Sequence, residues 1–143
     1  MGKIVVPVAV SSVTDPTRSI TFDAMVDTGA FGLILPSAWK EALGPLPEPV
    51  AVEIETADQR VVPANVCGPV RIQVGEFRRV FGEVIFIDMQ PGVHGYEPLV
   101  GYTILELCGI VIDMVSHQLV ARQYFDVKRT SPRAGAGGTL EAR

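Results

Sequence analysis

The apolar residues of this chain fall into short runs, which are spaced for strands and too brief for long helices. Residues 19–26 alternate Ile, Phe, Ala and Val with Ser, Thr and Asp, which is the period of two expected of a strand with one buried face. Val and Ile dominate the other runs, and both favour strands. Further strands are predicted at residues 3–10, 31–35, 50–56, 61–74, 77–88, 110–114 and 118–125. The pattern therefore predicts an all-β fold.

One or two short helices are expected to interrupt these strands. The first is predicted at residues 37–43, where Pro36 stops the preceding strand and Gly44 breaks the helix. The second is predicted at residues 102–107, with Gly109 placed just past its end.

Turn-forming residues join the predicted strands. Residues 57–60, which begin with Ala57, are mostly polar and are expected to form the tip of a β-hairpin. Pro63 and Pro69 fit an edge or a bend of a strand better than its centre, because proline donates no backbone hydrogen bond. Residues 89–98 are rich in Gly and Pro, and we expect them to form a loop.

The composition predicts one globular domain followed by a tail. Of the 143 residues, 48% are hydrophobic, and the mean hydropathy is +0.31, so a core can form without disulfide or metal staples. We place the domain at residues 1–126. Residues 127–143 are basic and contain a run of Ala and Gly that cannot build a core. We expect a flexible tail there, with a partner-binding arm as the alternative.

Charge, hydropathy and cysteine usage argue against several classes of protein. A net charge of −4 disfavours a nucleic-acid binder, which would carry a basic face. No apolar run approaches the roughly 18 residues of a membrane span, and the apolar part of the amino terminus is too short for a signal peptide. Cys67 and Cys108 lack metal-site spacing, and two histidines are too few for a zinc cluster, so no metal or cofactor is expected. We interpret both cysteines as free thiols in a reducing cytoplasm.

The strongest local signal is Asp27-Thr28-Gly29-Ala30, which directly follows the apolar strand at 19–26. This pattern places a carboxylate on a tight turn. Gly29 allows another backbone to approach closely, and its amide can donate to the Asp27 oxygens. Thr28 can hydrogen-bond across the turn and fix its geometry. A plain β-turn is the alternative, but such a turn needs neither the apolar flanks nor a second element downstream.

That second element is Leu99-Val100-Gly101, which is followed by the predicted helix at 102–107 and another apolar strand. With both elements in this order, the chain resembles the retropepsin-like, single-lobe aspartic proteases of clan AA, of the kind also found in bacteria. The resemblance extends from about residue 4 to residue 125 and includes a flap hairpin between the two elements. It implies an all-β acid-protease barrel with a single lobe.

The resemblance also implies a role for each residue of the first motif. Asp27 would be the catalytic acid, Thr28 would interlock two protomers, and Gly29 would bind the substrate backbone. Peptide hydrolysis of this kind needs two carboxylates that share one proton, of which one acts as a base on water and the other polarises the scissile carbonyl. The chain has no second Asp-Thr-Gly or Asp-Ser-Gly, so activity requires a symmetric homodimer.

Further residues are assigned to the substrate by the same resemblance. Ala30 would contact the substrate beside the catalytic loop, and Ala57, Asp58 and Gln59 would do so from the tip of the flap. Residues 99–101 would pack beneath the catalytic loop. The predicted function is thus an aspartic endopeptidase that acts on a peptide or protein substrate.

Two positions depart from the pattern of the viral-type members. Those members often carry an Asp directly after Asp-Thr-Gly-Ala and an Arg after the apolar-apolar-Gly, which together form a buried ion pair. Here the two positions are Phe31 and Tyr102, so we expect an apolar contact to replace the ion pair. The change leaves open a catalytically silent domain that serves as a dimerisation or peptide-binding module.

The remaining candidates have structural interpretations. Asp113 lies in an apolar strand and is expected to make a structural hydrogen bond. His94, between glycine-rich loop segments, is expected to be exposed, and Trp39 is expected to pack the first helix onto the sheet.

Overall fold

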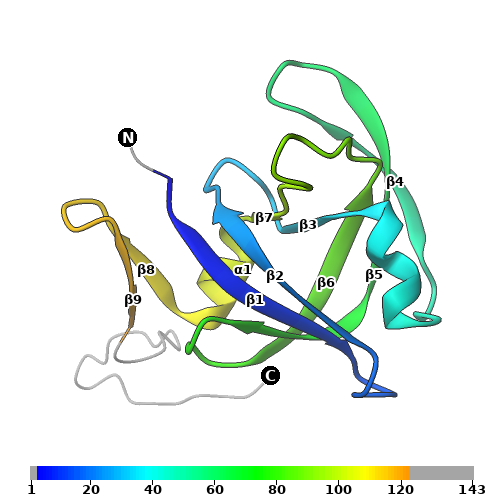
Figure 1. The fold of residues 1–143 in the computed structure, drawn as a ribbon, viewed down its shortest axis with the longest axis horizontal. Coiled ribbons are helices and arrows are strands. Elements are labelled where there is room, and N and C mark those ends of the chain that lie inside the picture. The colour runs from blue at the N-terminus through cyan, green and yellow to red at the C-terminus, as the bar shows by residue number, and fades with distance from the viewer. Residues whose placement is uncertain (1–2, 123–143) are drawn as a thin grey trace, which may run out of the picture.

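The computed structural model describes residues 3–122, which form a closed β-barrel with two short helices (Figure 1). The strands are β1 (Val5–Ser12), β2 (Ser19–Val26), β3 (Leu33–Pro36), β4 (Val50–Glu55), β5 (Val61–Val74), β6 (Val80–Ile87), β7 (Leu99–Val100), β8 (Ile110–Asp113) and β9 (Gln118–Ala121). The helices are η1 (Ser37–Leu43), which is a 3₁₀ helix, and α1 (Tyr102–Cys108). Among the described residues, no helix has the length and apolar character needed to cross a membrane. The predicted all-β, retropepsin-like barrel is confirmed.

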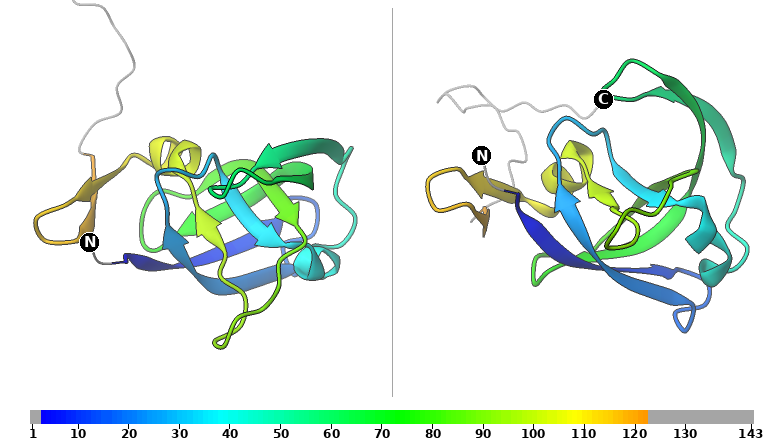
Figure 2. Two further views of the ribbon diagram at one scale, coloured as in Figure 1. Left: turned by 90° about the horizontal axis from the view of Figure 1, so that it is seen from above. Right: turned by 45° about the horizontal axis from the view of Figure 1, so that its top comes forward.

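Six strands close the barrel in the order β1-β2-β7-β3-β6-β5, because β5 pairs both with β6 and with β1. The first part of β5 pairs with β4, which lies outside the closed ring. Strand β7 is parallel to β2 and antiparallel to β3, and it separates these two strands. The hairpin of β4 and β5 rises beside the end of the barrel at which β2 stops (Figures 1 and 2).

The predicted elements match the observed ones closely, with a few shifted ends. The strand expected at residues 31–35 begins only at Leu33, because the backbone of the two preceding residues bonds to the start of α1 instead. The strand expected from Phe77 begins at Val80, since the Phe77 amide closes a turn onto Val74. Strand β7 was not predicted as a strand. Residues 123–125 of the last predicted strand and the predicted tail at 127–143 lie outside the described residues.

Both prolines of β5 occupy the kind of position that the sequence indicates. Pro63 lies in the part of β5 that has only β4 as a neighbour, so it forms an edge there. Pro69 lies at the irregularity where the register between β5 and β6 shifts, between Cys67 and Val70. Neither proline therefore interrupts a regular ladder on both sides.

The barrel interior is filled by aliphatic side chains that project from every second strand position. Strand β1 contributes alternating Val residues and β5 contributes Val and Ile residues, all of them mostly or fully buried, and α1 adds Ile104 and Leu105. Helix η1 covers one side, where the Trp39 ring packs on Phe22 with 5.2 Å between ring centroids and on Tyr96 with 5.8 Å. Trp39 thus packs the first helix onto the sheet, as predicted.

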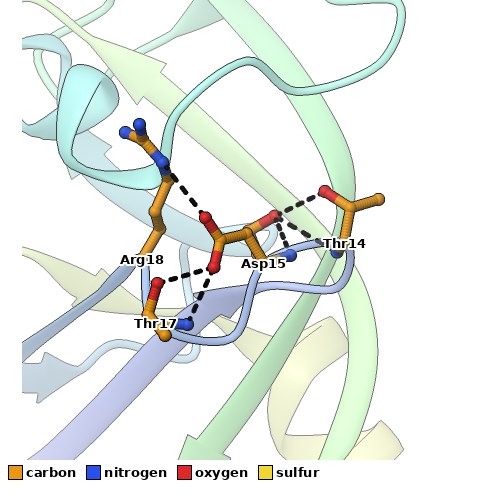
Figure 3. Close-up of polar contacts among 5 residues, drawn as sticks. Thr14, Asp15, Thr17 and Arg18 are labelled. Carbon is orange, nitrogen blue, oxygen red and sulfur yellow. Dashed lines mark hydrogen bonds and ion pairs between the residues drawn. The ribbon is translucent and has the colours of Figure 1, made fainter.

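The turn between β1 and β2 is held by local polar contacts (Figure 3). Ser12 is a buried polar residue, and its hydroxyl oxygen accepts hydrogen bonds from the amides of Thr14 and Asp15. The Asp15 carboxylate accepts hydrogen bonds from the amide and hydroxyl of Thr17 and lies 3.5 Å from the Arg18 guanidinium. The Thr17 hydroxyl is the main reason that the pKa of Asp15 is below its usual value. This turn is structural and lies away from the motif residues.

Strands β8 and β9 form a separate two-stranded sheet that projects from the barrel beside α1 (Figure 2). The Asp113 carboxylate accepts hydrogen bonds from the amides of Val115 and Ser116 and from the Ser116 hydroxyl. These bonds close the hairpin turn and hold the pKa of Asp113 below its usual value, mainly through the Ser116 hydroxyl. The predicted structural role of Asp113 is confirmed.

Both cysteines are free and buried, at 1% exposure for Cys67 and 4% for Cys108. Burial raises the pKa of both thiols, and it raises that of Cys108 from 9.0 to about 11. We expect Cys108 to react with a thiol reagent at pH 8 roughly 100-fold more slowly than an exposed thiol, because its thiolate fraction is lower by that factor. Titration with a chromogenic disulfide, before and after denaturation, measures this difference.

An exposed thiol introduced by Ser37→Cys at the start of η1 gives the reference rate. The prediction is contradicted if Cys108 reacts as fast as the introduced thiol.

Candidate active site

The carboxylate of Asp27 stands at the end of β2, where the chain leaves the barrel wall and enters the loop to β3. The Asp27 amide donates to the Val100 carbonyl oxygen at 2.9 Å, and the Ala30 amide donates back to the Asp27 carbonyl at 3.0 Å. The Gly29 amide donates to Asp27 Oδ1 at 2.9 Å, as the sequence predicts. Asp27 is half-buried, whereas Thr28 and Gly29 are exposed. The Gly29 amide of the same loop therefore orients the Asp27 carboxylate, and part of the Asp27 side chain stays exposed to solvent.

Strand β7 holds this loop in place by lying between the two strands that flank it. Leu99 and Val100 pair in parallel with the last two residues of β2, and the same two residues pair antiparallel with the start of β3. Two residues thus hydrogen-bond to the chain before and after the loop. This pairing confirms the prediction that residues 99–101 pack against the loop.

The start of α1 binds the loop through its backbone. The amides of residues 101–103 donate to the carbonyl oxygens of Gly32, Ala30 and Phe31 at 2.8, 2.9 and 3.0 Å. The Thr103 hydroxyl adds a second hydrogen bond to the Phe31 carbonyl at 2.7 Å. Helix α1 has no side-chain cap, so the loop carbonyls satisfy the amides that begin the helix.

Gly101 is required at this junction by the closeness of the two backbones. A Cβ atom on Gly101 would lie 2.3 Å from the Ala30 carbonyl oxygen and 2.6 Å from the Gly32 nitrogen. Its φ of −94° is open to any residue, so the restriction is steric and does not come from backbone strain. The glycine in Leu99-Val100-Gly101 is thus explained by the approach of α1 to the loop that carries Asp27.

A cleft of about 580 Å³ opens beside Asp27. It is lined by Asp27, Gly29, Ala30, Phe31, Ile34, Ile54, Glu55, Thr56, Ala57, Ile85, Ile87 and Leu99. The cleft brings the loop after β2 together with the hairpin of β4 and β5, although about 25 residues separate them in sequence. Most of its wall is aliphatic, and Asp27 and Glu55 are the charged residues among those that line it.

Of the four residues predicted to bind substrate, two line the cleft and two do not. Ala30 and Ala57 line the cleft, and Asp58 and Gln59 are not among the lining residues. The Asp58 carboxylate accepts hydrogen bonds from the Thr56 hydroxyl and from Arg60 Nε, the latter at 2.8 Å. The Thr56 hydroxyl is the main cause of the lowered pKa of Asp58. Asp58 therefore closes the hairpin turn, within which its carboxylate is already engaged.

The aliphatic floor of the cleft was not recognised in the sequence. Residues 84–87 are all apolar, but Val84 and Phe86 face the barrel interior while Ile85 and Ile87 face the cleft. Ile34 on β3 joins them in a second apolar cluster, separate from the barrel core. Strict alternation within an all-apolar strand gives no contrast that marks one face as a binding surface.

The aromatic rings of Phe31 and Tyr102 meet edge to face, with 5.8 Å between centroids and an interplanar angle of 88°. An apolar contact therefore occupies the two positions at which the viral-type pattern has an ion pair, as predicted. Phe31 is 56% exposed and Tyr102 is 42% exposed, so neither ring belongs to the core.

The histidines take no part in the cleft. His94 and His117 are both exposed, and neither lines it. Across residues 3–122, no group of three His, Cys, Asp or Glu side chains is arranged to hold a metal ion.

Comparison with known families leads to the same residues. A family model described as aspartyl protease matches residues 7–102, which is 96 of the 143 residues. The matched region contains Asp27-Thr28-Gly29-Ala30, the hairpin of β4 and β5, and Leu99-Val100-Gly101. A search of curated proteins found no match.

The junction between α1 and the loop predicts a specific sensitivity. We expect Gly101→Ala to lower the free energy of unfolding by about 2 kcal/mol or more, because its Cβ cannot fit without moving the loop backbone. The shift in the urea midpoint measures this loss.

Gly92→Ala is the matched control. A Cβ there would meet its nearest atom at 3.7 Å, an ordinary contact, so the change should stay within about 0.5 kcal/mol. Equal midpoints for the two variants would show that the close approach at Gly101 is not required.

Proposed function

We propose that this chain, which belongs to the aspartyl protease family, is an endopeptidase whose active site forms when two copies bring their Asp27 carboxylates together. The observation that carries the proposal is the Asp27 carboxylate, which the Gly29 amide orients at the wall of an apolar cleft. The sequence has no second Asp-Thr-Gly or Asp-Ser-Gly from which one copy alone could complete the pair.

In the proposed dimer, the two Asp27 carboxyls share one proton, since two ionised carboxylates at such short range repel strongly. The ionised one accepts a proton from a water molecule, whose oxygen attacks the scissile carbonyl carbon. The protonated one donates to the carbonyl oxygen. Collapse of the tetrahedral intermediate then breaks the C–N bond. The departing nitrogen takes up the proton that the first carboxylate removed from water, and a hydroxyl of the intermediate returns a proton to the second carboxylate. No cofactor enters this scheme.

The neighbouring residues take supporting roles in the proposal. Thr28 interlocks the two protomers and Gly29 binds the substrate backbone, and both are exposed beside Asp27 as such roles require. The tip of the β4–β5 hairpin serves as the flap, from which Ala57 contacts the substrate. Asp58 and Gln59 shape the tip of the hairpin, where the Asp58 carboxylate accepts hydrogen bonds from Thr56 and Arg60.

Two features support the association of two copies. The hairpin of β8 and β9 stands off the barrel as a two-stranded sheet, an arrangement that is marginally stable alone. It also exposes several large apolar side chains, namely Val111, Met114, Val115 and Val120. An exposed apolar patch on an unpaired sheet favours contact with another chain.

We place the protein in the cytoplasm, because both of its thiols are free.

A peptide-binding or dimerisation module without cleavage is the second candidate. It is favoured by the Phe31–Tyr102 contact, which occupies positions that carry an ion pair in viral-type members. The apolar cleft supports peptide binding under either proposal.

The first test removes the carboxylate. We expect Asp27→Asn to lower peptide cleavage by about 10³-fold or more and to leave dimerisation intact, because an amide cannot act as the base. A peptide-library cleavage assay and analytical ultracentrifugation measure the two properties.

Asp88→Asn, at an exposed position outside the cleft, is the control and should retain full activity. Cleavage that survives Asp27→Asn would refute the proposed enzyme, and a dimer that cleaves no library member would favour the silent module.

The second test asks whether the site needs both copies. When wild-type and Asp27→Asn chains are mixed equally and refolded together at fixed total concentration, we expect about one quarter of the wild-type rate, since random pairing leaves that share of intact dimers. Independent monomers would give about one half. The Asp88→Asn chain, mixed in the same way, should cause no loss.

A further inference from the structure

Beyond the candidate active cleft, a smaller hollow of about 190 Å³ lies on the other side of Phe31. Its walls are aliphatic and come from β6 and α1, and include Ile85, Ile104 and Leu107. Phe31 and Ile85 line both the cleft and the hollow, so the two adjoin at these side chains, and together they are called the trough below.

The aromatic side chain of Phe31 is the point at which the two parts meet. The Phe31 carbonyl accepts hydrogen bonds from both the amide and the hydroxyl of Thr103, which fixes the backbone that carries the ring. The edge-to-face contact with Tyr102 supports the ring from one side. Despite this support, 56% of Phe31 and 42% of Leu107 stay exposed. The trough thus has a positioned but uncovered apolar wall.

We propose that Phe31 is a specificity-determining residue, and that the hollow behind it binds an aromatic or large aliphatic side chain of the substrate peptide, beyond the two residues that flank the scissile bond. The proposal rests on the peptide-binding cleft of the proposed function. We assign the occupant to the same peptide because the hollow adjoins that cleft at Phe31 and Ile85, which an extended chain that passes Asp27 can reach. Successive side chains on one face of such a chain are about 6.6 Å apart.

The chemistry of the hollow disfavours an acidic occupant. Glu83 supplies the charged group among the residues that line it, so an acidic side chain is repelled there. An aromatic side chain covers the exposed part of Phe31 and gains an additional ring contact.

The experiment uses the full chain carrying Asp27→Asn, so that peptides bind without being cut. Fluorescein-labelled octapeptides share two central apolar residues, and each flanking position in turn carries Phe, Ala or Glu. Fluorescence anisotropy gives the dissociation constants. We expect one flanking position to prefer Phe over Ala by about 10-fold, and to disfavour Glu further. Adding Phe31→Ala should reduce that preference to about 2-fold or less, and adding Leu107→Ala should reduce it partly.

Phe81→Ala is the matched control, because Phe81 is also a phenylalanine, is 55% exposed and lines neither part of the trough. It should leave the preference unchanged. The inference is overturned if no flanking position prefers Phe, if Phe81→Ala and Phe31→Ala act alike, or if Phe31→Ala weakens dimerisation and leaves the peptide preference intact. The last result would place the ring between the protomers.

Cleavage of the same peptides by the wild-type chain separates this inference from the proposed function. A Phe preference that Phe31→Ala removes, in a protein that cuts nothing, supports the subsite and rejects the enzyme. Cleavage without such a preference supports the enzyme and rejects the subsite.

Discussion

The structure depends most on one contact, in which the loop that carries Asp27 and the start of α1 satisfy each other's backbone groups. The first amides of a helix have no partner within it, and loop carbonyls that belong to no strand or helix ladder need partners elsewhere. Here the amides of residues 101–103 donate to the carbonyls of residues 30–32. Because Gly101 brings the backbones this close, Leu99 and Val100 lie between β2 and β3, and the Asp27 amide reaches Val100.

This contact also explains why the barrel and the cleft are built from the same strands. With β7 in place, β3 and β6 run side by side beneath the loop, and both strands carry apolar side chains on their two faces. One face belongs to the barrel core, through Leu33 and Phe86, and the other is the aliphatic floor of the cleft, through Ile34 and Ile85. A substitution on the cleft floor therefore acts next to the core, whereas the exposed tip of the β4–β5 hairpin, at residues 57–60, can vary with little effect on the core.

The sequence revealed the features whose signal is local. Period-two alternation located β2 to the residue, and Asp27-Thr28-Gly29-Ala30 and Leu99-Val100-Gly101 are contiguous motifs. The features that it did not reveal depend on distant partners. Strand β7 has only two residues, and it is a strand because β2 and β3 flank it. The hollow behind Phe31 likewise exists because α1 packs near β6, which no periodicity within either segment indicates.

Under the proposed function, one copy of the chain can bind a peptide, but cleavage needs two copies. The aliphatic floor, the hairpin and Phe31 all belong to one copy of the chain, so a single copy already offers a peptide one full set of apolar contacts. The second carboxylate comes only from another copy, so cleavage depends on how many chains are paired. Binding is then set by the trough and activity by the concentration of the chain. A weak dimer would keep the peptidase silent at low concentration without any change in the cleft itself, and the exposed hairpin of β8 and β9 is the surface on which that balance would be set.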